Sequence, residues 1–412
     1  MAGESPLGMM RPKQGPGQGS RQGPPQRLPR RRTARGPRHR RILPVILSVL
    51  VLIALAGGWC WLWYYAAAKA DRTLAGWVQR EAAAGRVYSC GSQDITGFPF
   101  RIQAHCVQAG AQINSNQPPF AVNAKDITFT AQVYNPTLLV ARVTGPLTLS
   151  VPGQPPTFTA NWSSAEMSLH GLPPAPESVT VAVDNPRVDQ AIDSKATTIF
   201  TADSADVSTS IIDGSINSNP VIETLIHFAA ATAPTVHPLL AEPVQGDIDA
   251  EFKGFKDLAP KPWAQRFREM QADGGSIEIK RLRIERPDSI IIGVGTLTLN
   301  PDGKLEGLIR VAISGVENIV PQLGIDRAIG RGIDQLSGNK SGGQGLSALD
   351  RLMPGLGNAV RDTANSSIVD NLKKMGQPTE IDNKPAVVLP LRVSDGSVYL
   401  GMIPLGDLPP LF

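Results

Sequence analysis

The spacing of hydrophobic residues divides the chain into regions of different periodicity, and the first is an apolar run. No charged side chain occurs from Ile42 to Ala68. As an α-helix, the 24 residues of Ile42–Tyr65 would span roughly 36 Å at about 1.5 Å per residue, which exceeds the roughly 30 Å of a bilayer core. Five of the seven residues from Trp59 to Tyr65 are Trp or Tyr, a composition typical of the membrane–water interface. The pattern predicts a transmembrane helix over residues 42–65.

The helical spacing continues beyond this run. Leu74, Trp77, Val78 and Glu81 fall on neighbouring turns, and Gly85 follows where a helix C-terminus favours glycine. We therefore expect residues 66–84 to form a helical stalk that continues the anchor.

After Gly85 the period changes from 3.6 to 2, which is typical of half-buried strands. Pro and Gly separate the alternating runs, so the strands should be short and joined by tight turns. The clearest runs are 127–134, 147–151, 158–162 and 179–183.

Two hairpins are predicted near the C-terminus. Pro301-Asp-Gly303 separates alternating residues 297–299 from 305–313, and Asp395-Gly396 separates 387–393 from 398–402. In the strand that begins at Ile277, the apolar phase slips by one residue across Lys280-Arg281, as a β-bulge would produce.

Helical spacing returns over 263–271 and in two or three helices between 316 and 375, which the Gly- and Ser-rich segment 337–345 interrupts as a flexible loop. Since the last hairpin follows these helices and must pair with earlier strands, we expect one mainly β or α+β domain over residues 85–412. It should contain a curved antiparallel sheet with a few C-terminal helices.

Charge predicts the orientation of the anchor. Residues 1–41 contain eleven Lys and Arg and a single acid, Glu4. This basic tail has few apolar residues, so it should be disordered, and the positive-inside rule places it in the cytoplasm, where it would attract anionic inner-leaflet lipids. The alternative is a cleaved signal peptide, with a cleavage motif at Ala66–Ala68, although the apolar run is long for one. The remaining 29 basic and 35 acidic residues give a net charge of −6, so nucleic acid is not an expected partner.

The three cysteines have different expected roles. Cys60 lies in the apolar span, whereas Cys90 and Cys106 lie outside it, in a compartment that permits disulfides. We expect a structural disulfide between Cys90 and Cys106, with two free thiols as the alternative.

The sequence contains none of the common nucleophile, phosphate-binding, dinucleotide-binding or metalloprotease motifs. Its five histidines are scattered, without zinc-ligand spacing. We therefore expect no enzymatic activity, no cofactor and no metal site. A periplasmic hydrolase whose active site is assembled from dispersed residues remains the alternative, and a receptor-like partner of a cytoplasmic protein is a third possibility.

The alternating strands support one functional hypothesis. A uniformly aliphatic, concave sheet face can hold an acyl chain, because a lipid tail needs only a dry apolar groove. The candidate groove residues share one face of one hairpin: Leu297, Leu299, Ile309, Val311 and Ile313. The alternative is that the helices of 316–375 cover this face and make it an ordinary core.

Three segments resemble an uncharacterised alphaproteobacterial family, domain of unknown function 2125. They are Gly85–Cys106 with its Gly97-Phe-Pro-Phe-Arg101 block, Gly295–Gly303, and Asp395–Phe412. The resemblance covers roughly residues 85–412. It implies a single-pass protein of the Gram-negative inner membrane, with its C-terminal domain in the periplasm, and it supplies no catalytic residue. The combined expectation is a non-enzymatic component that handles lipid or acts as an envelope scaffold.

Overall fold

The computed structural model describes residues 42–114, 118–172, 175–192, 195–259, 261–323, 356–401 and 403–412. The predicted tail 1–41 and loop 337–345 lie outside these residues. The chain forms two compact units, Met1–Gly58 and Trp59–Phe412.

Helix α1 (Ile42–Ala83) runs through the predicted span and the predicted stalk without interruption. It is long and apolar enough to cross a membrane, and it is the one such helix among the described residues. Its aliphatic side chains from Leu43 to Leu55 are exposed, as a helix surrounded by lipid requires. The helix ends where Gly85 adopts a left-handed conformation (φ 80°), which few other residues tolerate.

The predicted antiparallel sheet is confirmed. In the described part of the chain, twenty strands form one open sheet. The strands are β1 (Arg86–Ser89), β2 (Ser92–Thr96), β3 (Arg101–Ile113), β4 (Phe120–Gln132), β5 (Asn135–Ser150), β6 (Phe158–Asn161), β7 (Ser164–His170), β8 (Ser178–Asp184), β9 (Arg187–Ile192), β10 (Lys195–Thr201), β11 (Ser204–Ser215), β12 (Ser218–Ala231), β13 (Val244–Lys253), β14 (Ser276–Glu285), β15 (Ile290–Leu299), β16 (Leu305–Ser314), β17 (Gln377–Ile381), β18 (Lys384–Ser394), β19 (Ser397–Leu400) and β20 (Ile403–Asp407).

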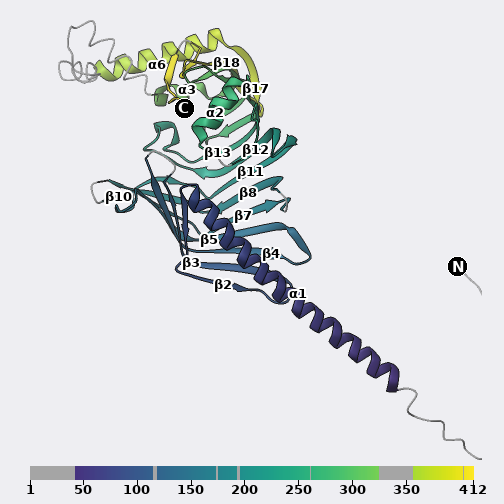
Figure 1. The fold of residues 1–412 in the computed structure, drawn as a ribbon. Coiled ribbons are helices and arrows are strands. Elements are labelled where there is room, and N and C mark those ends of the chain that lie inside the picture. The colour runs from purple at the N-terminus through teal and green to yellow at the C-terminus, as the bar shows by residue number, and fades with distance from the viewer. Residues whose placement is uncertain are drawn as a thin grey trace, which may run out of the picture. The chain divides into compact units, whose positions relative to one another are not determined.

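The pairing follows the chain closely. A continuous ladder runs β3-β4-β5-β7-β8-β11-β12-β13-β14-β15-β16-β18, and its strands are stacked along the domain (Figure 1). Strands β1 and β2 both pair with β3, and a branch β6-β9-β10 leaves β5. Strands β17 and β19 pair with β18, and β20 pairs with β19.

Within the described residues, five shorter helical elements include the predicted helix near Trp263. They are η2 (Pro238–Leu240), α2 (Trp263–Ala272), α3 (Val316–Ile319), η3 (Val320–Leu323) and α6 (Leu356–Met375). Helix α2 is tied to the preceding loop by the buried Arg266, whose guanidinium donates hydrogen bonds to the carbonyls of Asp257 and Ala259, both at 2.6 Å.

Both predicted hairpins and the predicted bulge are confirmed. Strands β15 and β16 pair across the Pro301–Gly303 turn, β18 and β19 pair across Asp395-Gly396, and the β14 register shifts between Ile279 and Leu282. The second strand of the last hairpin is shorter than predicted. Strand β19 ends at Leu400, and the chain then turns back into β20. The alternating pattern continued across this turn and therefore concealed it.

The two faces of the sheet differ in chemistry. Residues directly opposite each other in an antiparallel pair lie on the same face, so the register can be followed from strand to strand. One such series, here called the central apolar row, crosses the whole ladder: Ala104, Phe129, Ala141, Met167, Val181, Val207, Ile226, Ile248, Leu282, Gly293, Val311 and Leu389. On the other face, the neighbouring series is mainly polar from β4 to β14: Thr128, Arg142, Glu166, Ala182, Asp206, His227, Asp247 and Arg283.

Candidate functional site

A cavity of about 630 Å³ lies between the C-terminal part of α1 and the apolar face of the sheet. Its lining is mainly aliphatic, aromatic or small. Helix α1 contributes Asp71, Leu74, Ala75, Trp77, Val78 and Gln79, and the sheet side contributes Tyr88, Ser89, Cys90, Gln93, Cys106, Ala109, Gly110, Ala111, Val122, Ala124, Ile127, Phe129, Val143 and Leu147.

Contacts at both ends of this helical segment hold it against the sheet. At the N-terminal end, the indole N–H of Trp63 donates to the carbonyl of Arg101 at 2.9 Å, and that of Trp59 donates to the carbonyl of Pro99 at 3.0 Å. At the other end, the rings of Trp77 and Tyr88 pack with their centroids 4.8 Å apart. The helix is therefore anchored on two sides of the cavity.

Small residues opposite the helix explain why the cavity is open. Ala109, Ala111 and Ala124 form part of the sheet side, where α1 presents Leu74 and Val78. Because these alanines are too short to reach the helix, space remains between two apolar surfaces. An apolar space of this size lies within the roughly 300–1,000 Å³ typical of ligand pockets.

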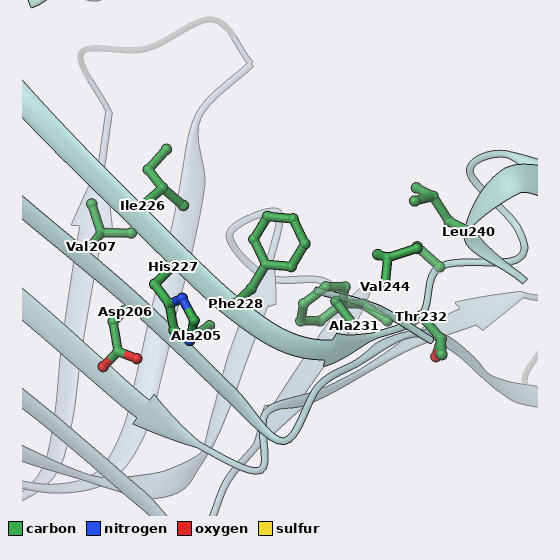
Figure 2. A pocket seen from close by; sticks show the side chains of 12 residues that line it. Ala205, Asp206, Val207, Ile226, His227, Phe228, Ala231, Thr232, Leu240 and Val244 are labelled. Carbon is green, nitrogen blue, oxygen red and sulfur yellow. The ribbon is translucent and has the colours of Figure 1, made fainter. Parts of the chain in front are cut away.

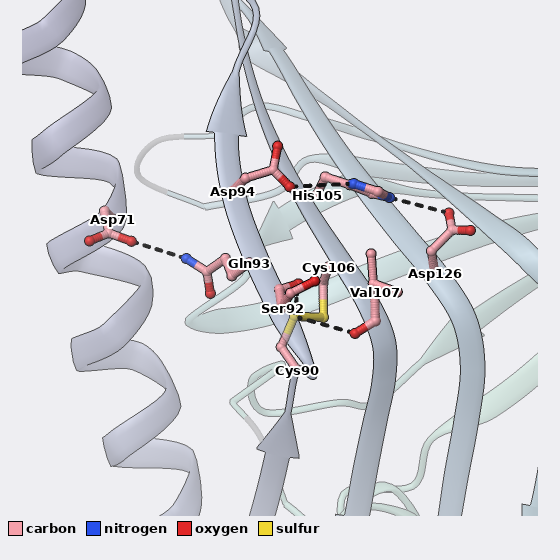
Figure 3. Close-up of a disulfide and its surroundings, with 9 residues drawn as sticks. All are labelled: Asp71, Cys90, Ser92, Gln93, Asp94, His105, Cys106, Val107 and Asp126. Atoms are coloured by element: carbon pink, nitrogen blue, oxygen red, sulfur yellow. Dashed lines mark hydrogen bonds and ion pairs between the residues drawn. A yellow bond between two sulfur atoms is a disulfide. The ribbon is translucent and has the colours of Figure 1, made fainter.

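The predicted disulfide is confirmed, and it lies in the cavity wall. The Cα atoms of Cys90 and Cys106 are 5.6 Å apart, within the usual range for bridged residues. The bridge ties the β1–β2 connection to β3 (Figure 3). Beside it, the side-chain amide of Gln93 donates to a carboxylate oxygen of Asp71 on α1 at 3.0 Å.

His105 does not line this cavity, although it precedes Cys106. Its ring lies between two carboxylates, with Nδ1 3.5 Å from Asp94 and Nε2 3.7 Å from Asp126 (Figure 3). His105 pairs with Thr128, so it belongs to the polar face. This cluster of titratable groups is thus separated from the cavity by the sheet.

The Tyr88 phenol in the cavity lining lies near the ion pair of Glu81 and Arg86. Burial raises the pKa of the Tyr88 phenol, and the negative charge of Glu81 adds to this effect. The hydrogen bond from Arg86 lowers the pKa of Glu81, with N and O 2.5 Å apart. A phenol with a raised pKa is neutral near neutral pH, so Tyr88 adds no charge to the lining.

A second, smaller apolar cavity of about 290 Å³ lies further along the sheet. Its lining includes Val207, Ile226 and Phe228 of β11 and β12, with Phe200 and Leu240 from flanking segments. In Figure 2, Val207, Ile226 and Phe228 point to one side of the strands and Asp206 to the other. Two members of the central apolar row, Val207 and Ile226, therefore line this cavity.

The predicted groove residues of the β15–β16 hairpin do not form an open groove. Leu297, Ile309, Val311 and Ile313 are buried in one core cluster, and Leu299 is buried in a neighbouring cluster with Met270 and Phe255. The groove hypothesis is wrong for this hairpin, because α3, η3 and α6 contribute Val316, Ile319, Val320 and Leu372 to the same core.

The residues that line the open apolar cavity at α1 were not among the predicted groove residues. Two signals were available. One is the set of small residues Ala109-Gly110-Ala111 in an otherwise ordinary strand, and the other is the apolar side of the stalk, with Leu74 and Val78.

Comparison with known proteins places the chain in a family context. The family described as uncharacterised protein conserved in bacteria (DUF2125) matches residues 63–409. The match includes the C-terminal part of α1 and nearly all of the sheet domain. No curated protein matches the sequence significantly.

Proposed function

Because this match makes the chain a member of the DUF2125 family, whose description gives no activity, we propose a function from the geometry of the site. The protein is a non-enzymatic, lipid-handling component of the bacterial envelope. It holds the acyl chain of a membrane lipid in the cavity between α1 and the sheet.

The observation that carries the proposal is an apolar cavity formed by the same helix that is long enough to cross a membrane. Each CH₂ group moved from water into such a space contributes about 0.8 kcal/mol. A bound acyl chain needs no hydrogen-bonding partner, which agrees with the scarcity of polar side chains in the lining.

A second observation supports a position of the cavity close to the bilayer. The turn between β2 and β3 presents Phe98 and Phe100, which are 48% and 62% exposed. Phe98 contacts Trp63 and Tyr64, and Phe100 contacts Trp59. Exposed aromatic side chains grouped in this way are typical of membrane–water interfaces.

We further propose that the membrane is the Gram-negative inner membrane and that the domain faces the periplasm. The support is the excess of basic residues before the span, together with the disulfide Cys90–Cys106, which fits an oxidising compartment. Membrane lipids are then the partners, and the negative charge of the domain disfavours nucleic acid.

The test is to fill the cavity. The full chain is extracted in a mild detergent and examined for bound lipid by native mass spectrometry. Ala124 is a buried, small lining residue, so Ala124→Phe should occupy the space and reduce bound lipid at least about fivefold, with little change in melting temperature.

Asn123→Phe is the matched control, because Asn123 is the exposed neighbour in the same strand and alternation places it on the other face. It should retain the lipid. The proposal fails if the unaltered protein carries no lipid, or if Ala124→Phe carries as much as Asn123→Phe.

A further inference from the structure

The cavity at α1 and the cavity at β11–β12 lie on one uninterrupted apolar surface. The residues that join them are the first part of the central apolar row. Phe129 pairs with Ala141, Ala141 with Met167, Met167 with Val181, Val181 with Val207, and Val207 with Ile226. Phe129 lines the first cavity, and Val207 and Ile226 line the second.

We infer that this surface is a continuous lipid track, along which an acyl chain from the first cavity extends, or passes, to the second. The inference rests on the proposed function of the first cavity. It adds a second binding site on β11–β12 for the same class of ligand, glycerophospholipid acyl chains.

The dimensions of the track suit this ligand. The track crosses six neighbouring strands, which are about 4.8 Å apart, so the five intervals between them make it roughly 24 Å long. One leaflet of a bilayer core is roughly 15 Å deep, so a lipid tail that starts in the first cavity fits on the track.

Exposure differs between parts of the row, and within the track it ranges from 1% at Ala141 to 37% at Val207. Val207 and Val311 belong to the same row, yet Val207 is 37% exposed and Val311 is 3% exposed. The row is therefore covered where α3, η3 and α6 pack on it, and it is accessible to solvent at β11. Aliphatic side chains that stay accessible, such as Val207, are unfavourable in water unless a ligand covers them.

The chemistry of the two faces favours lipid over a protein as the occupant. The six residues of the track carry no side-chain nitrogen or oxygen, whereas a protein interface ordinarily carries about one hydrogen bond per 100–200 Å². The polar groups lie on the opposite face, where Arg142 and Glu166 form an ion pair at 2.7 Å. The track is also continuous with the cavity next to the membrane-spanning helix.

The test is site-specific photocrosslinking in the full chain, in membranes that contain radiolabelled phospholipid. A benzophenone amino acid replaces Phe129, Val181 or Ile226 on the track, and Thr180 or Leu225 on the opposite face as matched controls. We expect labelled lipid adducts at all three track positions, at least about fivefold above both controls.

Each other outcome is informative. Adducts at position 129 alone would overturn the track and leave the proposed function of the first cavity intact. No adduct at any position would overturn both. Equal labelling of track and control positions, or a protein adduct at 181, would also refute the track.

A blocking variant tests continuity independently. Val181→Asp places a carboxylate between the two cavities. It should reduce the adduct at Ile226 at least about fivefold and leave the adduct at Phe129 unchanged, with an unchanged melting temperature as the check on folding. Undiminished labelling at Ile226 in the folded variant would contradict a continuous route.

Discussion

Two valines of the central apolar row provide a direct test of the difference between its covered and open parts. Val311 is buried in the core with Leu389 and Val320, whereas Val207 is 37% exposed. The same substitution to glutamate at each position changes the chemistry identically. Any difference in effect therefore measures the surroundings of the two side chains.

The expected loss of folding free energy in Val311→Glu follows from the burial of a carboxyl group. A glutamate has an ordinary pKa of about 4.3, and each pKa unit corresponds to about 1.4 kcal/mol. If the introduced group stays neutral in the core at pH 7, its protonation alone costs about 4 kcal/mol, to which the loss of valine packing adds. At about 2 °C per kcal/mol for a domain of this size, Val311→Glu should melt at least about 8 °C below the unaltered protein.

The cost has a defined pH dependence. Burial raises the folded-state pKa of the introduced carboxyl above its unfolded value. The destabilisation by ionisation is therefore absent below the unfolded pKa of about 4.3, and it grows as the pH rises above that value. Val311→Glu should accordingly lie closer to the unaltered protein at pH 4.5 than at pH 7.5.

Val207→Glu should cost at most about 1 kcal/mol at either pH, because its carboxylate reaches water. Circular dichroism melting of the full chain in detergent, at pH 4.5 and 7.5, measures both variants. The reasoning is refuted if Val311→Glu melts within about 2 °C of the unaltered protein at pH 7.5, or if Val207→Glu is equally destabilised.

Three further predictions concern the disulfide, an ion-pair network and topology. Replacing Cys90 and Cys106 by alanine should lower stability by about 3 kcal/mol in the chain-entropy estimate, measured as a lower melting temperature, whereas Cys60→Ala, at the free cysteine, should have little effect. The hydrogen bond from Lys280 lowers the pKa of Glu251, and Lys253 adds to the shift. The ion pairs of Glu251 therefore stabilise the fold above the unfolded pKa of this carboxyl, and this stabilisation is lost as the pH falls through the folded pKa. In Glu251→Gln, the melting temperature should accordingly fall less steeply as the pH is lowered. An alkaline phosphatase fusion after residue 100 should be active in cells, and an inactive fusion would reverse the proposed orientation.

The sheet could be predicted from the sequence because its signals are local. Alternation of side chains between two faces identifies strands, and Pro301-Asp-Gly303 and Asp395-Gly396 identify turns whatever surrounds them. The bulge at Lys280-Arg281 was visible for the same reason, as a phase slip within one strand.

The open site could not be predicted, because it depends on contacts between distant segments. Val207 and Val311 both lie in alternating strands, and the packing of α3, η3 and α6 makes Val311 part of the core. The cavity likewise requires residues 71–79 of α1 to lie over β3 and β4. The continuity of the central apolar row depends on the register of many successive pairs, which a single strand does not reveal.

The position of the cavity along α1 connects the structure to the proposed function. Asp71, at the start of the cavity lining, follows Tyr65 by six residues in one continuous helix, which places it about 9 Å further along the axis. The polar layer on each side of a bilayer core is roughly 5–8 Å thick. On the proposed orientation, the cavity therefore begins just beyond the headgroups. The disulfide braces the sheet side of its wall, and the Asp71–Gln93 hydrogen bond joins that wall to the helix. An acyl chain that leaves the bilayer along α1 would cross only this thin polar layer before it reaches apolar surface again, so the membrane anchor also sets the distance over which a lipid must be transferred.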